Sequence, residues 1–185
     1  MFDAALKGWS IAALSLSIIF LSTFVLTSQT GLSRNPKTQT PAKAEEQKEL
    51  TTSLSLSPRE VTAKVKGQQT ISLNINTEKD NVAALKLHLS FDPKVMKVDS
   101  IAPSAFFEKA SILHKEIDNK TGKVIFVFGS IEPKAGSGEA AVIRLSTLTE
   151  GVSELEITSE SEVAATGKTY NVVKSTGGAT LKVTK

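Results

Sequence analysis

The sequence predicts an all-β domain, an antiparallel sandwich of about nine strands, preceded by one long apolar segment. Apolar residues recur at every second position in most segments after that segment, as in Leu85, Leu87 and Leu89. Turn-forming residues separate these segments roughly every ten residues, which is typical of sandwiches. The only helical candidate that follows the apolar segment is short, residues 104–110.

Residues 1–33 predict one N-terminal transmembrane helix that serves as an uncleaved signal-anchor. No charged residue occurs in residues 8–33, and about 20 apolar residues are enough to cross a bilayer. Trp9 lies at one end, where an interfacial aromatic side chain is favourable. A cleaved secretory signal is the alternative, although no small-residue cleavage pattern follows the run. A buried helix of a soluble protein is a third interpretation, but no amphipathic stripe is visible.

Residues 34–53 predict a flexible linker, because they contain two prolines and are otherwise mostly Lys, Glu, Gln and Thr. Residues 54–185 then form the globular domain, which is long enough for one packed core. The strand candidates in order are residues 61–66, 69–76, 82–91, 95–101, 112–117, 123–130, 139–149, 153–158 and 179–183.

The composition excludes most catalytic and metal-binding classes. Cysteine is absent, so disulfides, thiolate metal sites and a cysteine nucleophile are excluded. The two histidines, His88 and His114, have no identifiable catalytic partners, and a net charge of +3 does not suggest nucleic-acid binding. Glu154 and Glu156 share one face of a strand, where a solvated surface is the simpler interpretation than acid–base chemistry. The sequence therefore indicates no enzyme, no catalytic residue, no cofactor and no metal.

One further motif has a simple structural interpretation. Asn119-Lys120-Thr121 matches a glycosylation sequon, but residues 118–122 also have the composition of a hairpin loop. No Gly-rich phosphate loop and no EF-hand calcium loop occurs in the sequence.

The segment 123–128 is unusual because both of its faces are apolar. Val124, Phe126 and Phe128 alternate with Ile125 and Val127. The outer face of a two-sheet sandwich is ordinarily wet, so Ile125 and Val127 are either covered by a loop or part of a binding surface. On the candidate strand 82–91 the polar face carries Lys86, His88 and Ser90, which share a surface with Ile125 and Val127 if the two strands are neighbours. These five side chains, Lys86, His88, Ser90, Ile125 and Val127, are the predicted partner-binding residues.

Four segments, taken in order, resemble signature stretches of cohesin domains. They are residues 66–73 with an early Gly turn, 82–98 with a strand ending in Phe-Asp-Pro, 121–126 with a Gly-led strand, and 138–145 with a late strand. The resemblance covers about residues 56–183, nearly the whole globular domain, and the wider group of carbohydrate-binding-module-like sandwiches shares much of the pattern. It implies a nine-stranded jelly-roll β-sandwich that binds dockerin modules on one sheet face. In that family the calcium belongs to the dockerin, so the resemblance implies no cofactor here. It assigns no dockerin-contacting residue, because those residues vary.

Three functions remain open. The first is a membrane-tethered, extracytoplasmic cohesin-like module that binds a protein partner, dockerin-bearing or other, at the cell surface. The second is a carbohydrate-binding module of the cell envelope that binds polysaccharide. Sugar sites usually need exposed aromatic rings, however, and only six aromatic residues follow residue 24, namely Phe91, Phe106, Phe107, Phe126, Phe128 and Tyr170. The third is a structural envelope domain without a ligand. The domain is secreted rather than anchored if the N-terminal segment is cleaved.

Overall fold

The computed structural model describes residues 48–185. The predicted transmembrane helix in residues 1–33 and most of the predicted linker lie outside the described residues. Within residues 48–185, no helix is both long and apolar enough to cross a membrane. Glu45–Lys185 forms one compact unit.

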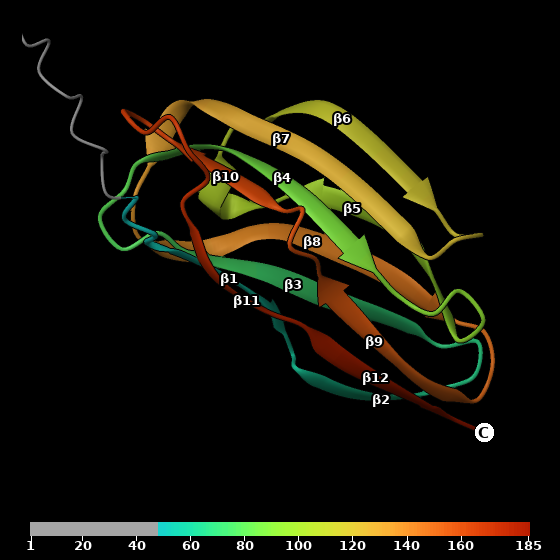
Figure 1. The fold of residues 1–185 in the computed structure, drawn as a ribbon. Helices are drawn as coiled ribbons and strands as arrows, with labels where there is room; N and C mark the ends of the chain where they lie inside the picture. The colour runs from blue at the N-terminus through green and yellow to red at the C-terminus, as the bar shows by residue number, and fades with distance from the viewer. Residues whose placement is uncertain (1–47) are drawn as a thin grey trace, which may run out of the picture. The chain divides into compact units, whose positions relative to one another are not determined.

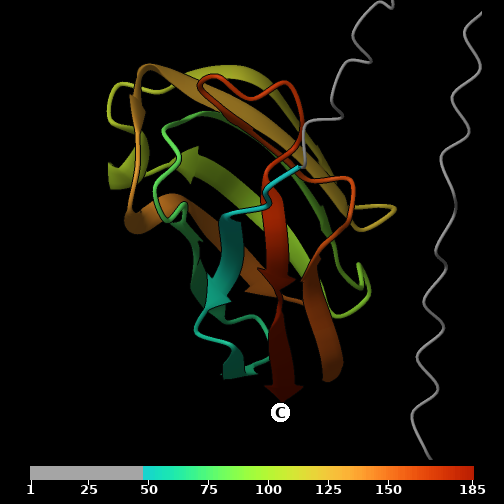
Figure 2. The same cartoon turned by 60° about the vertical axis from the view of Figure 1, so that its left-hand side comes forward.

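The described chain is a sandwich of two β-sheets with one short 3-10 helix, η1, which spans Ala105–Phe107. The strands are β1 (Thr52–Ser57), β2 (Glu60–Lys64), β3 (Gln68–Asn76), β4 (Val82–Ser90), β5 (Met96–Pro103), β6 (Ser111–Asp118), β7 (Lys123–Lys134), β8 (Ser137–Thr147), β9 (Gly151–Ile157), β10 (Glu162–Ala165), β11 (Val173–Gly177) and β12 (Ala179–Thr184). One sheet has five strands in the order β11-β1-β3-β8-β5. The other has seven, in the order β2-β12-β9-β4-β7-β6, with β10 also paired to β4. Figures 1 and 2 show the two sheets as facing layers.

The core lies between these layers and follows from the alternation in the sequence. In β4, Leu85, Leu87 and Leu89 are buried, and in β7 Phe126 and Phe128 are completely buried. All residues of the core cluster lie between Leu54 and Val183. The unit 45–185 therefore contains a complete hydrophobic core and is expected to fold without the N-terminal segment. The all-β, two-sheet prediction is confirmed.

Twelve strands are present where the sequence predicted about nine. The additional strands are β1, β10 and β11, which have four to six residues each: β11 is an edge strand, β1 lies beside it, and β10 pairs with β4. β1 begins at Thr52, two residues before the predicted start of the domain, and Thr51 and Thr52 are buried. Its composition, with serine at alternate positions and a Lys/Glu-rich segment before it, resembles a linker, which explains why the sequence did not reveal this strand.

The strands at the two ends of the domain run side by side, and they correct the prediction of a wholly antiparallel sandwich. β1 pairs in parallel with β11 in one sheet, and β2 pairs in parallel with β12 in the other. The two segments therefore pass from one sheet to the other side by side, the first near Pro58 and the second at Gly178. A Cβ atom at Gly178 would lie 2.7 Å from the carbonyl oxygen of Leu155, so this crossing requires glycine.

Side chains bridge the open side of the sandwich between edge strands β5 and β6. The side-chain oxygen of Asn119 accepts a hydrogen bond from the Val98 N–H at 2.8 Å, and its amide donates to the Val98 carbonyl at 3.0 Å. Lys115 Nζ donates to the Ile101 carbonyl at 2.9 Å. These contacts satisfy backbone groups of β5 that no strand pairs, and they protect an edge that would otherwise be available to another chain.

Candidate functional site

The candidate site is the outer face of the seven-stranded sheet around β4 and β7. Because side chains alternate along β4, the burial of its leucines places Lys86, His88 and Ser90 on the outer face. In the same way, the burial of Phe126 and Phe128 places Ile125 and Val127 on the outer face of β7. Both strands take these orientations because the leucines of β4 and the phenylalanines of β7 are buried in the core between the two sheets.

The structure brings the five predicted residues together. β4 and β7 are antiparallel neighbours, with Lys86 opposite Val127 and His88 opposite Ile125. Ser90 lies opposite Lys123 in the next pair. Directly opposite residues of antiparallel strands have their Cβ atoms about 5 Å apart, so these side chains are in one surface.

Carboxylates line the other side of β4 in the same rows. Glu162 of β10 lies opposite Lys86, with 3.3 Å between Oε1 and Nζ. Glu160, in the turn between β9 and β10, approaches Nδ1 of His88 to 3.0 Å. Glu156 of β9 lies opposite Ser90, which donates a hydrogen bond to it at 3.4 Å. Three parallel rows therefore cross the face, each with a glutamate at one end.

Two shallow hollows open on this face, with the apolar residues of β7 in their linings. A hollow of about 390 Å³ contains Ile125 and His88 and is bordered by residues 158–160. A second hollow, of about 360 Å³, contains Val127 and Lys86 and is bordered by Glu162 and by residues 168–171. Ile125 and Val127 are both half-buried. The loop-cover interpretation is therefore confirmed in part, because loop residues border these side chains and leave hollows above them. The binding-surface interpretation stays a prediction.

Strand β6 extends the face beyond β7, and the sequence did not single it out. His114 lies opposite Val127 and Glu116 lies opposite Ile125. At the start of β6, Ile112 and Leu113 are 50% and 67% exposed. A β-bulge between Ile112 and His114 breaks the alternation there, so a period-2 pattern could not identify which residues of 112–117 are exposed.

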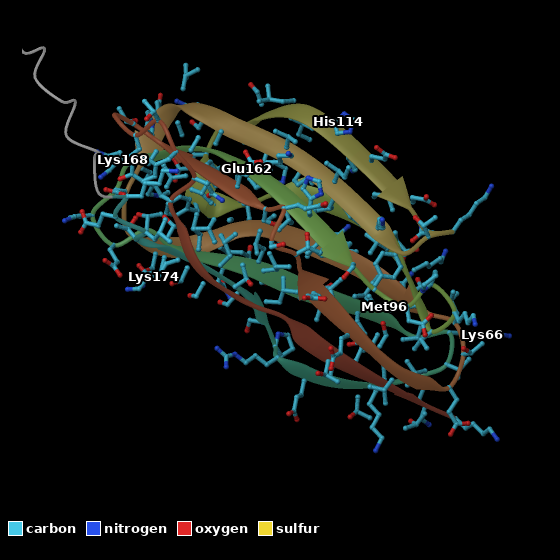
Figure 3. All side chains as sticks on the ribbon, in the orientation of Figure 1. Lys66, Met96, His114, Glu162, Lys168 and Lys174 are labelled. Carbon is cyan, nitrogen blue, oxygen red and sulfur yellow. The ribbon has the colours of Figure 1, made fainter. Side chains whose placement is uncertain are left out.

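The face is acidic on the side of β9 and β10. Glu154, Glu156, Glu160 and Glu162 are all exposed, as the solvated-face interpretation of Glu154 and Glu156 expected. Figure 3 shows Glu162 and His114 on this sheet, on either side of the site. Within residues 48–185 no group of three or more His, Cys, Asp or Glu side chains could hold a metal ion.

The aromatic residues offer little for sugar stacking in the described part of the chain. Phe91, Phe106, Phe107, Phe126 and Phe128 are buried. Tyr170 is half-buried, and its ring lies near two cations, with Lys168 Nζ at 5.7 Å and Lys48 Nζ at 6.0 Å from its centroid. A hollow of about 510 Å³ on the outer face of the five-stranded sheet is lined mainly by polar residues and glycines, without an aromatic ring.

The motif Asn119-Lys120-Thr121 belongs to the turn between β6 and β7 and not to a ligand site. Asp118 accepts hydrogen bonds from the Thr121 hydroxyl at 2.7 Å and from the Lys120 N–H at 2.8 Å, and these bonds lower the pKa of its carboxyl. Gly122 has a φ of +73°, and its N–H donates to the Asp118 carbonyl. The side-chain amide nitrogen of Asn119 donates its hydrogen bond to the Val98 carbonyl.

Comparison with known proteins identifies the fold and the family. The family model described as "Cohesin domain" matches residues 54–184. Among solved structures, the cohesin CaCohA2 from Clostridium acetobutylicum is 17% identical with a TM-score of 0.61, and the match covers 74% of this chain and 92% of that one. The cohesin of the Coh-OlpC–Doc435 complex from Clostridium thermocellum is 14% identical with a TM-score of 0.61, covering 75% and 98%. A non-cellulosomal cohesin from the archaeon Archaeoglobus fulgidus is 14% identical with a TM-score of 0.57, covering 73% and 92%. Among curated proteins none matches the chain.

Proposed function

Because the chain belongs to the cohesin domain family, we propose that the outer β4–β7 face binds a protein partner of dockerin type. The Coh-OlpC–Doc435 structure is described as a type I cohesin–dockerin complex, and CaCohA2 has been solved with the dockerin CaDoc0917. In the proposed assembly the N-terminal segment 1–33 anchors the chain in a membrane, and the domain lies outside the cytoplasm at the cell surface or in the envelope. If the segment is cleaved, the same domain is secreted. The domain is a binding module and not an enzyme.

The observation that carries the proposal is the row of half-buried apolar side chains in β7, each beside a charged or polar residue of β4. Ile125 and Val127 are two residues apart, which separates them by roughly 7 Å along the strand. Burying two such side chains in a complex contributes favourable free energy, while the polar rim sets orientation. This is the arrangement of an apolar centre with a polar border that protein interfaces have.

The backbone pairing indicates what kind of element the partner presents. β4 and β7 are interior strands whose N–H and C=O groups are used by neighbouring strands. An extended peptide lying on this face would find no backbone partners, whereas a helix satisfies its own. Side chains four residues apart on a helix are about 6 Å apart along its axis, close to the spacing of Ile125 and Val127. A helix with two apolar side chains therefore fits the face.

The binding test uses the 45–185 fragment and a panel of calcium-loaded dockerin modules, including those solved with the matching cohesins, measured by biolayer interferometry. The expected result is saturable binding to at least one dockerin, reduced at least tenfold by Ile125→Asp, because the charge must be desolvated in the complex. The matched control is Val142→Asp, which changes a half-buried outward residue on the five-stranded sheet. Equal affinity of Ile125→Asp and wild type would remove this face from the proposal, and failure of every dockerin would remove the dockerin-type partner.

The location is tested separately on the full chain. An alkaline phosphatase fused after Lys185 is active only outside the cytoplasm, so the proposal expects activity in intact bacterial cells. The mass of the purified chain distinguishes an anchored protein, which retains residues 1–33, from a cleaved one. An inactive fusion that accumulates in full would contradict the extracytoplasmic location.

A further inference from the structure

Two residues that line the hollow around Ile125 each have a buried polar atom without a hydrogen-bond partner. Among the described residues, only three buried side-chain nitrogen or oxygen atoms are without a partner, and two of them, His88 Nε2 and Thr158 Oγ1, belong to residues that line this hollow. Buried polar groups are nearly always paired, so each exception requires an explanation. Both atoms lie where the turn between β9 and β10 crosses the edge of β4.

Hydrogen bonds to the backbone hold that turn at its two ends, while its tip lies outside the strand pairing. The Thr158 N–H donates to the His88 carbonyl at 3.0 Å, and the His88 N–H donates to the Ser161 hydroxyl at 3.0 Å. The Ser161 N–H donates to the Thr158 carbonyl at 3.1 Å, which closes a four-residue turn. Ser159 and Glu160 are the central residues of this turn, and both are outside the strand pairing.

The tip is held to the site by one side-chain contact, from Glu160 to His88. The Glu160 side chain is 73% exposed, while the His88 side chain is only 14% exposed. Because an ionised carboxylate only accepts hydrogen bonds, Nδ1 of His88 carries the proton in this contact. In the neutral ring Nε2 is then a bare acceptor, and it is buried without a donor.

We propose that Glu160 is a gate over this hollow, closed in the present structure, and that docking of the partner swings it away from His88. In the open state a hydrogen-bond-donating side chain of the partner enters beside Ile125, where His88 Nε2 and the Thr158 hydroxyl gain the bonds they lack. The inference rests on the proposed binding face. It adds that this half of the face is covered in the free protein and that its gate opposes docking.

The neighbouring row provides the matched comparison. Glu162 approaches Lys86 to 3.3 Å and is 58% exposed, so it resembles Glu160 in charge and in exposure. Glu162 lies within β10 and is paired to β4, and Lys86 has no unpartnered buried atom among the described residues. Two further charged groups flank this site: Lys123 of β7, which also lines the hollow, and Glu156 of β9, which accepts a hydrogen bond from Ser90. Neither makes an ion pair with His88 in the described part of the chain.

The first test needs no partner. In the 45–185 fragment, nitrogen-15 NMR of the imidazole reports the tautomer of His88, and methyl relaxation in the presence of the soluble radical TEMPOL reports access to Ile125. Glu160→Ala is expected to move His88 away from the Nδ1–H tautomer and to increase the radical effect on the Ile125 methyl groups. Glu162→Ala is expected to change neither. Identical spectra for Glu160→Ala and wild type would overturn the gate, whatever the domain binds.

The second test uses any dockerin that the wild-type fragment binds. Removing a contact that opposes docking should strengthen binding, by about two- to fivefold for an exposed ion pair of this kind. Glu162→Ala is the control for the loss of one negative charge. Weaker binding by Glu160→Ala than by Glu162→Ala would show that Glu160 contacts the partner directly, and would overturn the gate. If no dockerin binds, the proposed partner type fails, and the NMR result alone decides whether the gate exists.

Discussion

Replacing Asn119 with alanine should destabilise the domain because the Asn119 side chain takes the place of a strand partner. Its oxygen and its amide nitrogen bond the N–H and the carbonyl of Val98, a residue that is 1% exposed. Each such bond contributes about 1 kcal/mol net, and a buried group left unpaired costs about 1–3 kcal/mol. Because solvent can partly reach the edge of β5 once the side chain is removed, we expect a loss near 2 kcal/mol rather than the upper limit.

The assay is urea unfolding of the 45–185 fragment followed by far-ultraviolet circular dichroism, since the only tryptophan, Trp9, is outside this fragment. The control is Asn81→Ala, an exposed asparagine whose side chain makes no hydrogen bond among the described residues, which should change the unfolding free energy by less than about 0.5 kcal/mol. A loss below 0.5 kcal/mol for Asn119→Ala would show that the two bonds to Val98 do not hold β5. The same geometry predicts that the folded domain is not glycosylated at Asn119 in a glycosylating host, as intact mass would show.

Three further predictions concern the core, a turn and pH. Gly122→Ala should cost at least about 2 kcal/mol in urea unfolding, because φ is +73° and the added Cβ would lie 2.1 Å from the Phe91 carbonyl oxygen; near-wild-type stability would contradict this turn geometry. Phe126→Ala should cost about 3–5 kcal/mol, because the ring is completely buried, and a loss under 1 kcal/mol would mean that the ring is not in the core. The pKa of Glu139 is lowered by hydrogen bonds from the hydroxyls of Ser104 and then Ser72, so its contribution to stability is complete above its ordinary pKa of 4.5 and is lost as pH falls through the lower folded value. Wild type should therefore lose more stability than Glu139→Gln between about pH 5 and pH 3, and parallel pH curves would contradict the assignment.

Local alternation was enough to predict the central strands and which of their side chains point outward at the candidate site. Leucine at every second position in β4 specifies which face is buried, and therefore which face presents Lys86, His88 and Ser90. The two apolar faces of β7 pointed to Ile125 and Val127 as unusual, and the register with β4 confirms that these residues are neighbours. The pairing of β4 with β7 does not follow from sequence order, because β5 and β6 lie between them in the chain, and the structure alone shows that the two faces are neighbours.

The remaining features depend on contacts between residues distant in the sequence. The parallel pairing of β1 with β11 joins segments separated by more than a hundred residues, and no local pattern encodes it. No local pattern distinguishes Glu160 and Glu162, because their contacts with His88 and Lys86 depend on where the turn after β9 crosses β4. The bulge in β6 displaced the exposed residues Ile112 and Leu113 from a period-2 pattern.

The most direct test of the central claim is to map the surface of the 45–185 fragment that a bound dockerin covers. Amide chemical shifts recorded during titration with the tightest-binding dockerin of the panel locate that surface residue by residue. We predict that the largest changes fall on Lys86, His88, Ile125 and Val127 and extend into β6. Changes concentrated on the outer face of the five-stranded sheet, around Asn74 and Val142, would contradict the account.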